Sequence, residues 1–480
     1  MLLTNIKKNI LFNILLTLSN VLIPIITFPF VSKTIGPEGV GRVQFAQTFI
    51  QYFSFLAALG IPIYGIRLIA KSKNLINKRK VIFSNLVFIN VFFSLILLIC
   101  YATIVFSSSF LYADFQFYLI GSITILLSFS NVDWYFSGLE KFKLIAFRSI
   151  ISKLISTILV FLFVKNQSDD LLYFFLITCA ALVNNIYNIY SLRKEFSFFL
   201  VNYNEIIKYI RPLLLIFLTV VAASIYSTLD VLILGRIKGY VELGYYSAAS
   251  KINKMVIPLL TAISAALLPK LSFDIENNNH LESKKLIQKS LDVSILLGIP
   301  IVIGIAILAP ELVIVIAGYD FIPSVQSVQI MSPVILIIAI STICSVQVLI
   351  PFSRDLQNAI SVLIGLILSL ILNFILVPLY GHIGATISNV SSELVVMAMF
   401  SFYASRYIKL NFKWKDIITT IIICLFFIVI IEFIRQFVSN NLVIIMFSVL
   451  FCGLWFFFIH FFVTKNEIIR KEITNLLKLR

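Results

Sequence analysis

Apolar runs of about twenty residues recur along this whole chain and limit the folds available to it, since one such helix crosses a hydrocarbon core of roughly 30 Å. Hydrophobic residues make up 60% of the 480 residues and charged residues only 12%, whereas soluble domains are about a quarter charged. Strands of a membrane barrel would be about ten residues long and alternate in polarity, which these runs do not. The sequence therefore predicts an all-α polytopic membrane protein.

Fourteen segments are predicted to cross the membrane, with boundaries uncertain by about two to four residues. They lie near 9–31, 43–66, 81–106, 115–137, 144–164, 171–192, 212–235, 245–269, 288–310, 327–350, 358–378, 382–404, 416–437 and 441–463.

Most of the 38 Lys and Arg residues fall in the loops on one side of this arrangement. The basic segments are 67–80, 140–148, 193–211, 270–289, 406–415 and the tail from Lys465. Cytoplasmic loops carry such an excess of Lys and Arg. Both termini are therefore predicted to be cytoplasmic, and the start of the chain is interpreted as a retained anchor because it has no small-residue cleavage site.

The formal charge of +16 does not indicate nucleic-acid binding, because these cations are confined to short loops between apolar runs. All five cysteines fall in predicted spans, so no disulfide framework is expected. The three histidines are scattered without ligand spacing, and no metal site is predicted.

A weak internal repeat links two hairpins. An offset of 203 positions places Gly36 on Gly239 and Gly41 on Gly244. Each hairpin joins an outgoing span to a returning one, which suggests two halves related by an axis along the membrane normal, as in several transporter folds.

The returning span of each hairpin carries a polar face. Gln44, Gln47, Thr48, Gln51 and Ser54 recur at spacings of three and four in the first half, and the same offset gives Ser247, Ser250, Lys251 and Lys254 in the second. Such a face must meet other helices or water, because lipid cannot satisfy its donors. Interhelical hydrogen bonding would explain the Ser and Thr. The glutamines and lysines favour a hydrated cavity.

Three carboxylates within spans are further candidates. Asp230 and Lys251 each lie roughly 9 Å from the outer end of a span, at a depth that permits pairing across the hairpin. Glu393 lies mid-span on a side shared with Asn389 and Ser392, which makes it a candidate ion carrier or gate. Asp133, near an inner end, fits a structural cap or an inner gate.

Five stretches resemble the polysaccharide transporter family, which contains the O-antigen and related lipid-linked oligosaccharide flippases of a superfamily that also includes multidrug exporters. They are FPFVSKTIGPEGVGRVQFAQTFIQYFSFLAALGIPIYGIRLIAK, NVDWYFSGLEKFKLI, STLDVLILGRIKGYVELGYYSAASKI, AALLPKLS and LNFILVPLYGHIGATISNVSSELVV. The resemblance implies two six-helix lobes around a cationic cavity. The corresponding divisions are 1–192 for the first lobe, 193–211 for a cytoplasmic linker, 212–404 for the second lobe and 405–480 for an extra helix pair with a basic tail.

The resemblance also implies a non-enzymatic activity, the transfer of undecaprenyl-pyrophosphate-linked repeat units to the outer leaflet of a bacterial inner membrane by alternating access. In this interpretation Lys251 and Lys254 hold the pyrophosphate, and Arg42, Arg67 and Arg148 assist. The residues expected to contact sugar are Gln44, Gln47, Gln51, Ser247 and Ser250, and those expected to couple or gate are Asp230, Glu393 and Asp133.

No cofactor is expected beyond a coupling proton or sodium ion. The expected partners are the lipid-linked oligosaccharide, membrane lipids and the polysaccharide polymerase machinery, and the chain is expected to be a monomer. An ion-coupled multidrug antiporter of the same superfamily is the alternative, although an acidic first-half cavity would be expected for it. A membrane glycan polymerase or ligase is less well supported, because neither a large outer loop nor a carboxylate cluster is visible in the sequence.

Overall fold

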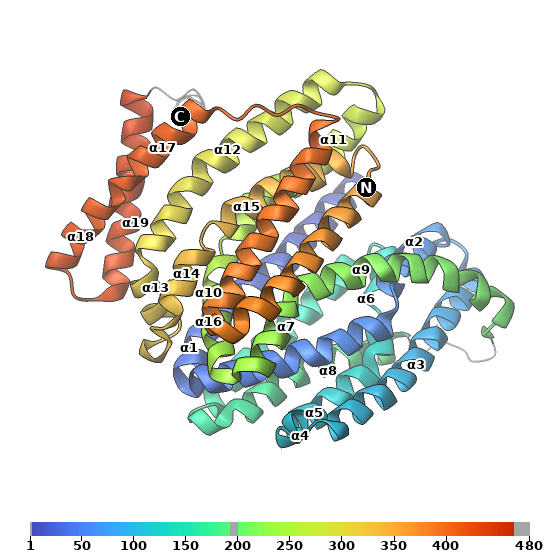
Figure 1. Ribbon diagram of the computed structural model, residues 1–480. Helices are drawn as coiled ribbons and strands as arrows, with labels where there is room; N and C mark the ends of the chain where they lie inside the picture. Colours follow the sequence, from blue (N-terminus) through green and yellow to red (C-terminus); the bar gives the residue numbers. More distant parts are fainter. Residues whose placement is uncertain (1, 193–199, 465–480) are drawn as a thin grey trace. The chain divides into compact units, whose positions relative to one another are not determined.

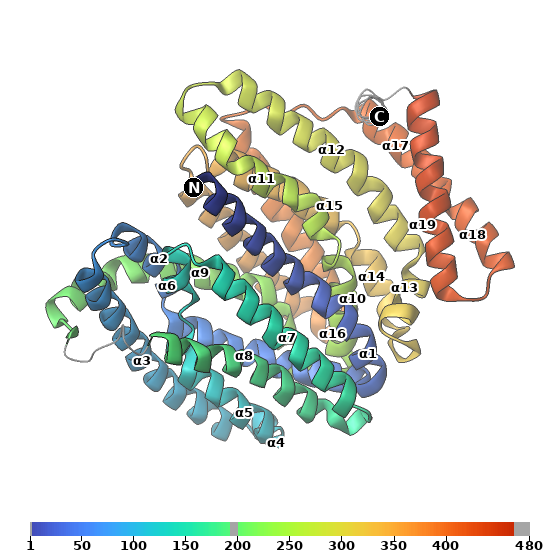
Figure 2. The ribbon, with the colours of Figure 1, turned by 180° about the vertical axis from the view of Figure 1, so that it is seen from behind.

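The computed structural model describes residues 2–192 and 200–464, and all regular structure in those ranges is helical. The chain divides into two compact units, Met1–Gly244 and Tyr245–Arg480. Figures 1 and 2 show the helices of both units from opposite sides. The predicted all-α membrane fold is confirmed.

Eleven helices in the described part of the chain are long and apolar enough to cross a membrane. Two of them, Leu15–Lys71 and Asp355–Ser405, are more than fifty residues long and at 1.5 Å per residue exceed twice the roughly 30 Å core. Each bends at a glycine in a positive-φ conformation, Gly36 at 69° and Gly381 at 56°. Each therefore supplies two consecutive spans, while the count of fourteen and the cytoplasmic termini remain predictions.

The first unit is built around the two arms of the long first helix. Its elements are α1 (Leu2–Ala58), α2 (Ile61–Lys71), α3 (Ile76–Ser107), α4 (Ser109–Ala113), α5 (Phe115–Leu126), η1 (Leu127–Ser130), α6 (Asp133–Gly138), α7 (Phe142–Phe163), η2 (Gln167–Asp169), α8 (Asp170–Leu192) and α9 (Tyr203–Lys238), followed by the start of α10 (Tyr240–Lys254). Helix α1 contacts α3, α5, α7 and α9. It therefore lies at the centre of this unit.

The predicted span 115–137 is not one continuous helix. It runs as α5, the tight turn η1 and α6, with non-helical backbone at Asn131 and Val132. The Ser128 hydroxyl in η1 lies 2.6 Å from the Ser94 hydroxyl of α3 and donates to the Asn90 side-chain amide oxygen at 3.1 Å. The Asn188 side-chain amide of α8 (Asp170–Leu192) donates to the Ser130 carbonyl oxygen at 2.9 Å. A neighbouring helix therefore satisfies a backbone group at this break, which lipid could not do.

The second unit contains the remaining helices. They are α11 (Ile257–Glu276), α12 (His280–Ile307), α13 (Ala309–Ile316), η4 (Tyr319–Phe321), α14 (Ser324–Met331), α15 (Val334–Thr342), the π-helix η5 (Ile343–Leu349), α16 (Asp355–Ser405), α17 (Trp414–Leu425), α18 (Phe427–Phe437), α19 (Asn441–Phe458) and the π-helix η6 (Ile459–Val463). The predicted span 245–269 is interrupted, because α10 ends at Lys254 and α11 begins at Ile257.

The boundary between the two units in the sequence falls inside α10, and α9 belongs to the first unit. The sequence assigns the span at 212–235, which lies in α9, to the second lobe. The predicted divisions at 1–192, 193–211, 212–404 and 405–480 remain predictions.

Candidate functional site

The predicted polar face of the first half lies on the second arm of α1, which begins after Gly36. Gln44 and Gln47 are half-buried, Thr48 is buried and Gln51 is exposed. The Gln44 amide donates to the Thr48 hydroxyl at 3.3 Å. The amides thus form a partly open polar strip on an apolar helix, anchored at its centre by a buried threonine.

Tyr52 on α1 and Thr228 on α9 extend this polar strip, and the sequence prediction included neither of them. Thr228 donates to the Tyr52 phenol oxygen at 2.9 Å, and Tyr52 donates to the Ile225 carbonyl oxygen at 3.3 Å. Tyr52 follows Thr48 by one helical turn, so the spacing of the polar face could have included it. Asp230, one of the predicted coupling residues, is buried further along α9.

The two hairpins of the repeat adopt the same backbone conformation. Gly36 has φ 69° and ψ −178°, and Gly239 has φ 86° and ψ −178°. A Cβ placed on Gly41 would meet the Tyr240 carbonyl oxygen, and a Cβ on Gly244 would meet the Pro37 carbonyl oxygen. The glycines matched by the offset therefore make a reciprocal backbone contact within the first unit, which supports the predicted repeat.

Helix α10 carries the predicted second polar face. Ser247 and Ser250 are buried, Lys251 is half-buried and Lys254 is exposed. Asn253 donates to the Val328 carbonyl oxygen at 3.3 Å, which fixes this helix against α14. Because Asp230 and Lys251 belong to different units, their pairing and a cavity shared by both polar faces stay predictions.

Arg42 lies at the centre of an ionic cluster that joins four segments of the first unit. Its guanidinium contacts the carboxylates of Glu38 at 2.5 Å, Asp170 at 2.7 Å and Asp114 at 3.3 Å. The Tyr240 phenol donates to Asp114 at 2.7 Å. Burial, together with the neighbouring Tyr118 and Asp114, raises the pKa of Tyr240, which keeps this donor protonated. With three carboxylates around it, Arg42 has little charge left to offer a phosphate.

Arg148 is likewise paired. It forms an ion pair with Asp133 and donates a hydrogen bond to the Asn188 side-chain amide oxygen. Its guanidinium also lies 5.5 Å and 5.7 Å from the ring centres of Phe136 and Tyr187. These contacts agree with a structural role for Asp133.

Two further candidates, Arg67 and Glu393, belong to neither cluster. Arg67, near the end of α2, is exposed, and Glu393 in α16 is half-buried beside the buried Ser392. The structure leaves the roles proposed for both residues as predictions.

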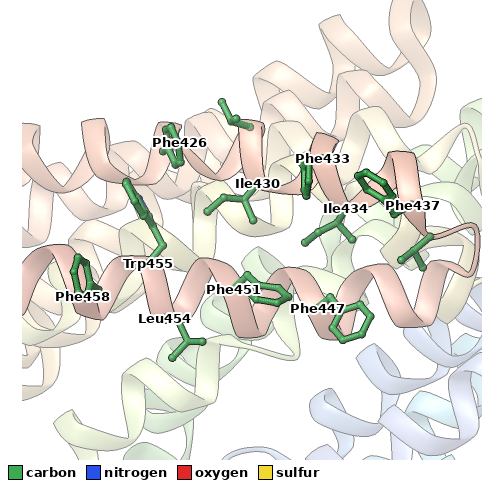
Figure 3. Close-up of a pocket in the computed structure, with 12 residues that line it drawn as sticks. Phe426, Ile430, Phe433, Ile434, Phe437, Phe447, Phe451, Leu454, Trp455 and Phe458 are labelled. Carbon is green, nitrogen blue, oxygen red and sulfur yellow. The ribbon is translucent and has the colours of Figure 1, made fainter.

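The extra helix pair α18–α19 is held at one end by a buried ion pair and encloses an apolar groove. Arg435 donates to Glu311 from two nitrogens, at 2.7 Å and 2.9 Å, and also pairs with Glu432. The groove between the two helices has a volume of about 810 Å³ (Figure 3). It is lined by Phe426, Val429, Ile430, Phe433, Ile434, Phe437, Val438, Phe447, Phe451, Leu454, Trp455 and Phe458.

Comparison with proteins of known structure shows the fold. The chain is similar to the lipid II flippase MurJ in an inward closed conformation, with a TM-score of 0.67 and 19% identity over 94% of this chain and 99% of MurJ. It is also similar to an inward-facing multidrug resistance MATE family transporter, with a TM-score of 0.60 and 15% identity over 82% of this chain and 94% of the transporter.

Comparison of sequences identifies relatives named for polysaccharide transport and glycan biosynthesis. A putative O-antigen transporter of Escherichia coli K12 is 28% identical over 82% of this chain and 95% of its own length. A probable low-salt glycan biosynthesis flippase of Haloferax volcanii is 28% identical over 40% of each chain. The family described as polysaccharide biosynthesis protein matches residues 6–273. Since this match covers more than half of the chain, the protein belongs to that family.

Proposed function

We propose that this protein is a flippase that moves a polyprenyl-pyrophosphate-linked oligosaccharide from the cytoplasmic to the outer leaflet of a bacterial inner membrane. The observation that carries the proposal is the pair of polar faces on otherwise apolar helices, one on α1 and one on α10. Amide and hydroxyl groups suit the hydroxyl-rich sugar units, and the ammonium groups of Lys251 and Lys254 suit the pyrophosphate.

The apolar groove between α18 and α19 gives a polyprenyl tail a place to lie. Twelve apolar side chains line the groove, so its contacts with an isoprenoid chain would be entirely hydrophobic. The tail would remain among apolar side chains and lipid while the headgroup crosses beside the polar faces.

A multidrug antiporter is the competing function, because the fold is shared with a MATE family transporter. A cationic drug needs a carboxylate that is not already neutralised. The carboxylates of Asp114 and Asp170 pair with Arg42, and that of Asp133 pairs with Arg148. This pairing removes three carboxylates of the first unit as partners for a cationic substrate, which favours the glycolipid.

The test is flipping in proteoliposomes that contain a fluorescent polyprenyl-pyrophosphate oligosaccharide. A membrane-impermeant quencher reports the headgroups that have reached the outer leaflet. We expect wild type to flip the lipid and Lys251→Gln/Lys254→Gln to flip it at least about tenfold more slowly, since charge-assisted hydrogen bonds contribute roughly 1.5–3 kcal/mol each.

The matched control is Lys285→Gln/Lys415→Gln, which removes two exposed lysines from other helices. We expect it to flip like wild type. Equal flipping by all three proteins would reject the assignment of Lys251 and Lys254. Drug efflux without lipid flipping by wild type would reject the proposed function itself.

A further inference from the structure

We propose that a cluster of arginines and aromatic rings at one end of the second unit, here called the ring platform, binds the pyrophosphate headgroup of a membrane lipid before transport. The platform consists of His280, Phe352, Arg354, Arg406 and Tyr407, with Phe402 and Tyr403 beside Arg406. Its ligand class follows from the proposed function, whereas its existence as an anion site is argued from the geometry below.

The rings of the platform form a continuous stack. His280 is parallel to Phe352 within 10°, with ring centres 5.8 Å apart, and Phe352 lies 5.1 Å from Tyr407 at an interplanar angle of 30°. These three residues come from α12, from the loop before α16 and from the segment after α16. Figures 1 and 2 both place the α11–α12 turn and the segment after α16 at the same end of the unit.

Two guanidinium groups lie over rings of the platform. The Arg354 guanidinium carbon is 5.0 Å from the centre of Tyr407, and that of Arg406 is 4.6 Å from the centre of Phe402 and 5.6 Å from Tyr403. Stacking of this kind orients the planar fork of an arginine, so less conformational freedom is lost when its N–H groups bind an anion.

No carboxylate in the described residues pairs with Arg354 or Arg406, and both side chains are exposed. By contrast, Arg42, Arg148 and Arg435 each form an ion pair with a carboxylate. Arg354 and Arg406 therefore keep their N–H donors and their charge for a ligand. A guanidinium group can bind phosphate through two parallel N–H···O hydrogen bonds, whereas an ammonium group acts as a point charge.

Two tight turns hold the platform in place. The Arg354 amide donates to the Leu349 carbonyl oxygen at 2.8 Å, and Ser353 adopts a φ of 56°. The Asn279 amide donates to the Asp274 carbonyl oxygen at 2.7 Å. Both are helix-ending motifs in which a residue in a left-handed conformation lets the next amide reach back to the helix. The ring stack is thus carried by short, hydrogen-bonded turns.

His280 and Arg406 lie in segments predicted to be cytoplasmic from the distribution of Lys and Arg, 270–289 and 406–415. The loop between the predicted spans 327–350 and 358–378 falls on the same side because successive spans alternate in direction. The platform therefore lies where a lipid-linked sugar made in the cytoplasm would first meet the protein. Tryptophan, tyrosine and basic side chains also gather at ordinary membrane interfaces. Attraction of any anionic lipid is thus the outcome that the experiment must separate from specific binding.

The experiment measures binding to the full chain in nanodiscs of neutral phosphatidylcholine by native mass spectrometry. The probes are a polyprenyl-pyrophosphate oligosaccharide and, separately, phosphatidylglycerol. We expect Arg354→Gln/Arg406→Gln to bind the pyrophosphate lipid at least about tenfold more weakly, and Lys285→Gln/Lys415→Gln, which removes the same charge, to change binding less than twofold.

Arg354→Lys/Arg406→Lys keeps the charge but removes the flat forks, and we expect it to lose most of the binding that the glutamine variant loses. Equal weakening by the control pair, or equal binding of phosphatidylglycerol and the pyrophosphate lipid, would overturn the proposal. Binding does not require transport, so wild type that binds but does not flip tells against the proposed function and leaves the platform standing.

Discussion

Replacing Gly41 by alanine tests the reciprocal contact between the two hairpins. The added methyl group would occupy the position of the Tyr240 carbonyl oxygen and lie 2.9 Å from the Gly244 nitrogen. Both obstacles are backbone atoms, which cannot rotate away as the end of a flexible side chain can. The variant must therefore separate the hairpin at 36–41 from the hairpin at 239–244.

The cost can be worked out from two opposing effects. Forced overpacking typically destabilises a protein by about 1–3 kcal/mol, and a clash with backbone belongs at the upper end. Alanine is favoured over glycine inside a helix by roughly 1 kcal/mol. The net loss is about 2 kcal/mol, which for a unit of 244 residues corresponds to a fall in Tm of roughly 4–8 °C.

The assay is thermal unfolding of the purified protein in detergent at one fixed scan rate. Gly304→Ala and Gly453→Ala are matched controls, because a methyl group at either position has no neighbour within 4 Å. They are expected to melt at or above the wild-type temperature. If Gly41→Ala melts with these controls, the hairpins are not in contact in the folded protein.

The reciprocal variant gives an independent check. Gly244→Ala would place its methyl group on the Pro37 carbonyl oxygen, so we expect a similar fall in Tm. Once one substitution has parted the hairpins, the second meets less resistance. The double variant should therefore lose less stability than the sum of the two single variants.

Three further predictions follow from buried polar contacts. Arg42→Gln removes the charge that Asp170 faces at 2.7 Å, so Tm should fall by an amount equivalent to roughly 1.5–3 kcal/mol, and adding Asp170→Asn should restore part of it. Arg435→Gln breaks the paired bonds to Glu311 and should speed proteolysis of the α17–α18 region while leaving the first unit intact. Gln347→Met removes the amide that donates to the Ser264 and Ser290 hydroxyls at 2.7 Å and 2.8 Å. Both hydroxyls would lose this partner, so thermal unfolding should show a loss of stability of about 1–3 kcal/mol. An unchanged Tm would exclude this hydrogen-bond network.

The helices could be predicted from sequence because hydrocarbon leaves the backbone few alternatives. The turns at Gly36 and Gly239 could also be predicted, because glycine adopts positive φ readily. The breaks inside predicted spans could not be found this way. The break after η1 occurs at a mostly polar stretch, 130–133, within an otherwise apolar span, and it is tolerated because the Asn188 side chain of another helix donates to the Ser130 carbonyl oxygen.

The candidate site was predictable only in part. Helical spacing correctly placed Gln44, Thr48 and Gln51 on one arm of α1, because spacing depends on one helix alone. The same spacing could have included Tyr52, but its contact with Thr228 on α9 could not be predicted from one helix. The partners of Arg42 could have been suspected, because Asp114 and Asp170 also adjoin loops on its predicted side of the membrane.

The arginines show why charge in a sequence is a weak guide to an anion site. Arg42 and Arg148 stand near the predicted cavity, yet carboxylates more than a hundred residues away, or on a neighbouring helix, neutralise them. Arg354 and Arg406 stand in short loops whose basic character orientation alone would explain. Only the fold reveals that these two have no carboxylate partner among the described residues and lie over aromatic rings. An anion site is therefore defined by which cations remain unpaired after folding, and for this protein that criterion selects the ring platform over Arg42 and Arg148.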